Sequence, residues 1–94
     1  MDDREIEERL RELVELMNQP AWNLEGVDHV GPDWRLVLSR QSNRVVVTFD
    51  HDEIAQNLET DATDKYYIRH ILGGLWQFTD PNDDRAVEVR AAMG

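Results

Sequence analysis

Two neighbouring apolar stretches, "WRLVLSR" at 34–40 and "RVVVTF" at 44–49, constrain the fold more than any other part of the chain. The first alternates apolar and polar residues, which is the period of a strand with one buried face. The second is rich in β-branched valine, which favours a strand. We predict an antiparallel hairpin in which six apolar side chains share the face that packs on a core. These six are Trp34, Leu36, Leu38, Val45, Val47 and Phe49.

The shared apolar face limits the register of this hairpin, because a shift by one residue would turn one of the two apolar sets toward water. We predict a two-residue loop at Ser42-Asn43 or a four-residue loop at 41–44. The predicted pairs are Leu38 with Val47, Leu36 with Phe49, Arg35 with Asp50, Val37 with Thr48 and Ser39 with Val46. The last three pairs would lie on the outer face, where an ion pair contributes about 0.2–1 kcal/mol.

The segment before the hairpin has the spacing of one helical face. Its apolar residues are Ile6, Leu10, Leu13, Val14 and Met17. We predict a helix from about Asp3 to Asn18, which Pro20 prevents from continuing. Residues 22–30 have a weaker pattern, because their two valines fall out of phase, and we expect a short or bulged strand there.

The junction that reads "DHDE" could be a metal site, an acid/base centre or the start of a helix. A helix start accounts for every residue, because Asp50 caps the helix and Glu53 completes a capping box. A metal site needs a second ligand three or four residues after His51, and apolar residues stand at both positions. His29 and His70 also have no local partner, so only convergence over a long range could form a site. We therefore expect no catalytic, cofactor-binding or metal-binding residue and no cofactor.

The most apolar segment, "TDKYYIRHILGGLWQF" at 63–78, predicts a core helix. Gly73-Gly74 lies inside it, at a cost of about 1 kcal/mol per glycine. This cost indicates either the close approach of another helix or a kink. Asp80 followed by Pro81 is typical of a helix start, so we predict a short last helix. Its apolar face would consist of Ala86, Val89 and Met93.

These elements predict one α+β domain that spans residues 1–94. We expect an N-terminal helix, an antiparallel β-hairpin or three-stranded meander, and then two or three C-terminal helices packed on one face of the sheet. A chain of this length buries about two-thirds of its unfolded surface. It has no cysteine, so packing alone must hold the fold together.

The net charge of the chain limits the classes of partner that it can bind. Its 20 acidic and 10 basic side chains give a net charge of −10, which repels phosphate backbones and anionic lipids. The N-terminal segment is acidic, and no apolar run approaches the roughly 18 residues that a membrane span needs. We therefore expect a cytoplasmic protein with no nucleic-acid partner and no membrane partner.

The hairpin departs from this acidic character, because it has no acidic residue between its tryptophan and its phenylalanine. Arginine beside outward-facing valine suits association with a protein. Alternatively, another element covers this face, or the arginines neutralise acids of the same chain. The candidate partner-binding residues are Arg35, Val37, Arg40, Arg44 and Val46.

We expect a non-catalytic protein-interaction or regulatory domain, whose partner is another protein or a second copy of the chain. In a homodimer, the acidic first helix would face the arginines of the hairpin. Two other functions stay open. The first is an acidic inhibitor or immunity-type protein that blocks a basic partner, and the second, further behind, is a metal-dependent hydrolase.

Overall fold

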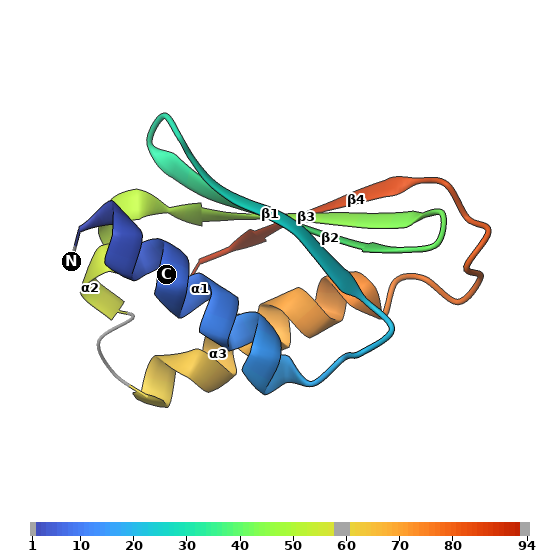
Figure 1. Ribbon diagram of the computed structural model, residues 1–94, viewed down its shortest axis with the longest axis horizontal. Helices are drawn as coiled ribbons and strands as arrows, with labels where there is room; N and C mark the ends of the chain where they lie inside the picture. Colours follow the sequence, from blue (N-terminus) through green and yellow to red (C-terminus); the bar gives the residue numbers. More distant parts are fainter. Residues whose placement is uncertain (1, 58–60, 93–94) are drawn as a thin grey trace.

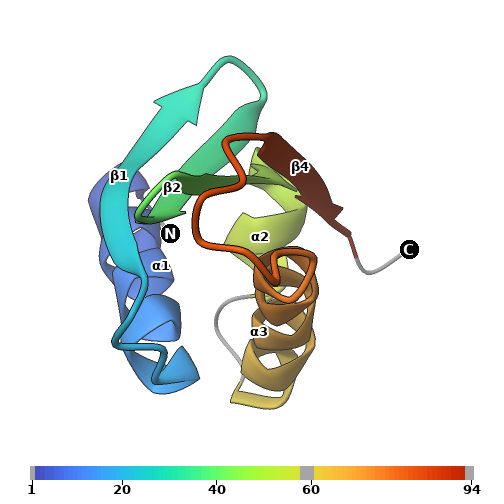
Figure 2. The same ribbon diagram turned by 90° about the vertical axis from the view of Figure 1, so that its right-hand side faces the viewer.

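The computed structural model describes residues 2–57 and 61–92 of the chain. Within these residues, β1, β2 and β3 form an antiparallel meander, and β4 lies parallel to β3, so the sheet order is β1-β2-β3-β4. The helices cover one face of the sheet, with α1 beneath β1 and α3 beneath β4 (Figure 1, Figure 2). The elements are α1 (Asp3–Met17), β1 (Asn23–Val30), β2 (Asp33–Arg40), β3 (Asn43–Asp50), α2 (His51–Asn57), α3 (Asp61–Leu75) and β4 (Ala86–Ala91).

The broad α+β class and the N-terminal helix are confirmed. The prediction that only helices follow the hairpin is wrong, because the chain returns to the sheet as β4 after α3. Two parallel strands need a crossover connection, and α2 and α3 supply it between β3 and β4. Among the described residues, no helix combines the length and the apolar character that a membrane crossing requires.

The faces of the hairpin are as predicted, but its register is not. All six predicted core residues are buried. The pairs are shifted by two residues, however, so that Leu38 lies opposite Val45 and the turn falls at Gln41-Ser42. A shift by two leaves each side chain on its own face, which is why the core prediction survives. Gln41 adopts the left-handed conformation that this turn requires, with φ at 50°.

A contact from the loop before β4 fixes this register. Asn43, 1% exposed, donates from its side-chain amide to the carbonyl oxygens of Asp80 at 2.9 Å and Asp83 at 2.7 Å. The backbone N–H of Ser42 donates to the carbonyl of Pro81 at 3.1 Å. Because buried polar groups need partners, these bonds hold Asn43 at the first position of β3.

The expected bulged strand at 22–30 is confirmed as β1. Its register against β2 shifts between Leu24 and Gly26, so Glu25 is the extra residue of a β-bulge. The bulge places Leu24 and Val27, which are three residues apart, on the same face of the sheet, and Val30 lies beyond it on the other face. Val27 is buried, whereas Val30 is 53% exposed.

The two long helices are tied to each other by a nearly buried ion pair. Arg9 of α1 binds a carboxylate oxygen of Asp64 on α3, and it also donates to Glu12 at 2.9 Å. Burial lowers the pKa of Arg9, but the bonds to Asp64 and Glu12 outweigh burial and raise that pKa above its usual value. The other carboxylate oxygen of Asp64 is buried without a hydrogen-bond partner. Arg9 therefore supplies the ion pair that offsets the burial of the Asp64 carboxylate.

The sequence predicted two helix caps, Asp50 and Asp80, and only the first is correct. Asp50 caps α2, because its Oδ1 accepts the backbone N–H of Glu53 at 3.0 Å. Asp80 does not start a helix, and its Oδ1 instead accepts the N–H of Asn82 at 2.9 Å in a turn. The segment that follows is β4, so the predicted last helix is wrong. Of its predicted apolar face, Met93 lies outside the described residues.

Candidate functional site

The five predicted partner-binding residues do not form one surface. Arg35 and Arg44 are exposed on the outer face of the sheet, away from the helices. Arg40 belongs to the opposite face, where its guanidinium lies 5.0 Å from the centre of the Trp22 ring and donates to Asn43. The three arginines therefore do not share one face of the sheet. Residues that are close together in the sequence are thus not close together on the surface.

The two valines of this predicted surface offer little apolar area. Val37 and Val46 pair with each other on the outer face, yet they are only 7% and 5% exposed. Acidic residues of the neighbouring strands lie beside the hairpin, with Asp28 opposite Arg35 and Glu88 opposite Val46. The outer face is thus a mixture of charges, and a role for it in binding stays a prediction.

A second candidate is a cluster that the sequence did not reveal. His29 of β1 and His51 of α2 stack with ring centres 4.6 Å apart, and His29 Nδ1 lies 2.7 Å from Oδ2 of Asp3 on α1. One donor atom from each of the three lies within 4.8 Å of the others, as in a metal site. His70 lies elsewhere, on α3 beside Tyr66. Two of the three histidines therefore converge over a long range.

The hydrogen bonds of this cluster do not suit a metal. Trp34 Nε1–H donates to Nδ1 of His51 at 3.0 Å, so the neutral His51 carries its proton on Nε2. The Nδ1–H of His29 donates a hydrogen bond to the carboxylate of Asp3, so only Nε2 of His29 has a free lone pair. A metal needs a lone pair from each ligand. The cluster instead joins the starts of α1 and α2 to the end of β1.

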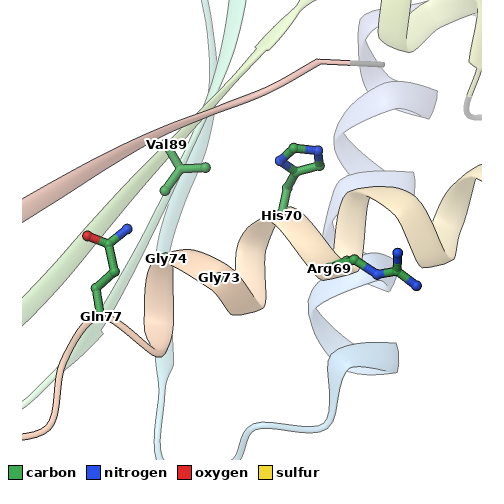
Figure 3. Close-up of a pocket in the computed structure, with 6 residues that line it drawn as sticks. All are labelled: Arg69, His70, Gly73, Gly74, Gln77 and Val89. Atoms are coloured by element: carbon green, nitrogen blue, oxygen red, sulfur yellow. The ribbon is translucent and has the colours of Figure 1, made fainter. Parts of the chain in front are cut away.

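The third candidate is a groove between α3 and the free edge of β4 (Figure 3). Its volume is about 310 Å³, and α3 forms one wall and β4 the other. The lining combines polar side chains with two glycines and one valine. These residues are Arg69, His70, Gly73, Gly74, Gln77 and Val89.

The two glycines in this groove have different surroundings. Gly74 is buried against the sheet, and a Cβ on it would lie 2.8 Å from Val89 Cγ2 and 2.9 Å from Val45 Cγ1. The predicted close approach is thus found, but it is made to strands and not to a helix. Gly73 is exposed, and a Cβ on it would meet no atom within 4 Å.

Gly73 therefore has no explanation inside the fold. Its φ is not positive, so the backbone does not require glycine there. It lies in the last turn of α3, where glycine costs less than the roughly 1 kcal/mol of a helix interior but is still less favourable than alanine. Its effect is to keep the wall of the groove free of a side chain. This cost was the one signal in the sequence that pointed to the groove.

The sheet has two edges, and they differ in how open they are. β1 is interrupted by the bulge at Glu25, whose carboxylate accepts the hydroxyl of Ser39. β4 pairs with β3 in a regular register from Ala86 to Ala91 without a bulge. Within the described residues, no strand covers the outer edge of β4. The regular edge thus lies beside the groove, and unpaired edges of this kind can pair with another chain.

Comparison with protein-family models, with curated proteins and with solved structures found no match for this chain.

Proposed function

We propose that the chain is a non-catalytic protein-interaction domain that binds an extended segment of a partner at the outer edge of β4. Such strand addition gives affinity through backbone hydrogen bonds and specificity through the side chains that enter a neighbouring groove. The single observation that carries the proposal is Gly73, an exposed helical glycine in that groove that internal packing does not require.

The chemistry of the groove supports binding. An extended segment beside β4 would send every second side chain toward the helix face of the sheet. There it would meet Val89, which gives an apolar contact, and the side chains of Arg69, His70 and Gln77, which donate hydrogen bonds. Absence of a side chain at Gly73 lets the segment approach the helix closely.

The same residues give no support to catalysis. The lining of the groove contains no serine, threonine or cysteine that could act as a nucleophile. Its one histidine, His70, packs against Tyr66 with ring centres 4.7 Å apart and ring planes tilted by 57°. A general base needs a substrate proton within hydrogen-bond reach and a group that orients the ring. We therefore assign His70 a role in binding.

A peptide selection tests this proposal. A display library of random peptides is panned on the wild-type protein, and enriched peptides are measured against two variants. Gly73→Leu places a side chain in the groove, and Gln56→Leu adds the same group at an exposed site on α2. We expect peptides that bind the wild type and Gln56→Leu but lose about five- to 150-fold in affinity for Gly73→Leu, because a buried clash of this size costs about 1–3 kcal/mol.

Amide hydrogen exchange of β4 gives a second readout. A bound strand should protect those β4 amides that point away from β3, because they would gain hydrogen bonds. Peptides that bind Gly73→Leu as well as the wild type, or that leave the β4 amides unprotected, would refute strand addition at this edge.

A further inference from the structure

We infer that the segment that occupies this edge is β4 of a second copy, paired antiparallel about a two-fold axis through Val89. The inference rests on the proposed binding site and names its partner. Two β4 strands joined in this way would form one continuous sheet with the helices of both copies on the same side. A two-fold contact requires a surface that is complementary to itself.

The charges of β4 are self-complementary in one register only. With Val89 opposite Val89, Glu88 of each copy faces Arg90 of the other, and two opposite-charge pairs form. A shift of the axis to residue 88 or residue 90 would place Glu88 opposite Glu88 or Arg90 opposite Arg90. Like charges in directly opposed positions destabilise a sheet.

The faces of β4 fit the same register. Glu88 and Arg90 lie beside Val46 and Thr48 on the outer face of the sheet, so their ion pairs would form there. Val89 faces the helices, where a Cβ on Gly74 would lie 2.8 Å from its Cγ2. The two Val89 side chains would therefore meet on the side of the sheet that faces the helices.

The spacing of the helices also fits. α3 touches both β3 and β4, because Gly74 contacts Val45 and Val89. Strands in a sheet are about 4.8 Å apart, so the α3 helices of two copies would lie about twice that distance apart. Packed helices are separated by about 8–10 Å. The second α3 would thus fill the groove of the first (Figure 3).

Gly73 gains an explanation from this arrangement. An axis through Val89 passes close to Gly74, which lies beneath it. The preceding residue, Gly73, lines the groove and would therefore face Gly73 of the second copy. Two helices in contact at glycine can approach closely. Toward the ends of the contact, His70 of one copy would face Gln77 of the other.

The remaining charges predict how salt affects association. Arg90 donates to Asp33 of β2 at 3.0 Å and to Thr48 of β3 at 3.4 Å, so its guanidinium lies over the sheet. To meet Glu88 of the second copy it would leave these exposed partners and turn toward the edge. Asp33 also raises the pKa of Arg90, which keeps that guanidinium charged. Each copy carries a net charge of −10, and the two repel each other. Screening of this repulsion should strengthen the dimer as salt increases.

Charge reversal and sedimentation equilibrium test the register. Glu88→Arg and Arg90→Glu each replace two favourable pairs by two unfavourable ones, and we expect the dissociation constant to rise about ten- to hundredfold. An equal mixture of the two variants restores both pairs in a heterodimer and should associate like the wild type. Arg11→Glu makes the same change of charge at an exposed site on α1, beneath the opposite edge of the sheet, and should dimerise normally. Circular dichroism checks that each variant is folded.

A single introduced cysteine gives an independent test that needs no charge reversal. The chain has no cysteine, so Val89→Cys can form a disulfide only with its own copy. Directly opposed residues in antiparallel strands are about 4.5–5.5 Å apart, within the range that a disulfide spans. Val89→Cys should cross-link under mild oxidation, whereas Val87→Cys, which would face Ala91, should not.

The outcomes separate the inference from the proposed function. A wild type that stays monomeric at all concentrations, or a dimer that both reversals leave intact, overturns the pairing of two copies. If peptide binding remains sensitive to Gly73→Leu in that case, the edge binds another protein. If the selection also fails, the proposed function falls as well.

Discussion

Adjacent glycines of α3 should respond in opposite directions to the same substitution. Alanine in place of glycine in a helix interior gains about 1 kcal/mol. At Gly73 nothing opposes this gain, because the added Cβ meets no atom within 4 Å. Because Gly73 lies in the last turn of α3, Gly73→Ala should raise the free energy of unfolding by about 0.4–1 kcal/mol.

At Gly74 the same gain is outweighed by overlap. The added Cβ would lie 2.8 Å from Val89 Cγ2 and 2.9 Å from Val45 Cγ1, whereas carbon atoms in contact prefer about 3.5–4.0 Å. Both neighbours are valines, whose branched side chains have little rotational freedom. Overpacking of this kind costs about 1–3 kcal/mol. Gly74→Ala should therefore be less stable than Gly73→Ala by about 1–3 kcal/mol.

Urea unfolding followed by circular dichroism measures this difference. Both substitutions are made in a Glu88→Arg background, so that association of two copies does not contribute to stability. Val89→Ala removes one of the two overlapping groups, and the loss caused by Gly74→Ala should shrink in its presence. Equal stabilisation by the two alanines would refute the close contact of α3 with β3 and β4.

Three further outcomes follow from buried and polar groups. Arg9→Ala should lower the free energy of unfolding by about 3–5 kcal/mol, because it leaves the charge of Asp64 buried and unpaired. The double variant Arg9→Met/Asp64→Leu removes both charges and should lose far less stability in the same urea assay. Burial and a nearby carboxylate raise the pKa of Tyr67 to about 12, so the stability that this group contributes is complete below pH 10.0 and falls as the pH rises toward 12. Urea titrations across these pH values should show a smaller decline in Tyr67→Phe. Because Trp34 occupies Nδ1 of His51, equimolar Zn²⁺ should leave the melting temperature unchanged, and a rise that His51→Ala abolishes would show that the metal displaces this bond.

The faces of the hairpin could be predicted from the sequence because they depend only on the alternation of side chains along each strand. The register could not, because it depends on Asn43 and its bonds to the distant carbonyls of Asp80 and Asp83. Local patterns specify which side of a strand is buried. They do not specify which loop will bind the first residue of that strand.

The last element was predicted wrongly because its sequence suits two structures. In "AVEVRA", Ala86 and Val89 have the spacing of a helical turn, and Val87 and Val89 have the alternation of a strand. The open edge of β3 decides between them, because its backbone groups need partners. That edge exists only in the folded sheet, so tertiary structure overrides the local preference.

The candidate sites could be predicted only in fragments. The helix start at Asp50 was recognisable because capping is local. The contacts of Asp3, His29 and His51 join three elements at one end of the fold, and no spacing in the sequence indicates them. Gly73 could be singled out in the sequence because glycine destabilises a helix. Its groove could not be predicted, because the second wall of the groove is β4, which was predicted as a helix.

The position of β3 between β2 and β4 has a consequence for how the chain folds. β3 carries "RVVVTF", and its second edge stays open until the chain has completed α2 and α3 and docked β4. Pairing across so long a connection is slow, and a valine-rich edge left open meanwhile can pair with other molecules. The net charge of −10 keeps such intermediates apart at neutral pH. Near the isoelectric pH of about 4.5 this protection disappears, so refolding there, more than storage of the folded protein, should lead to aggregation.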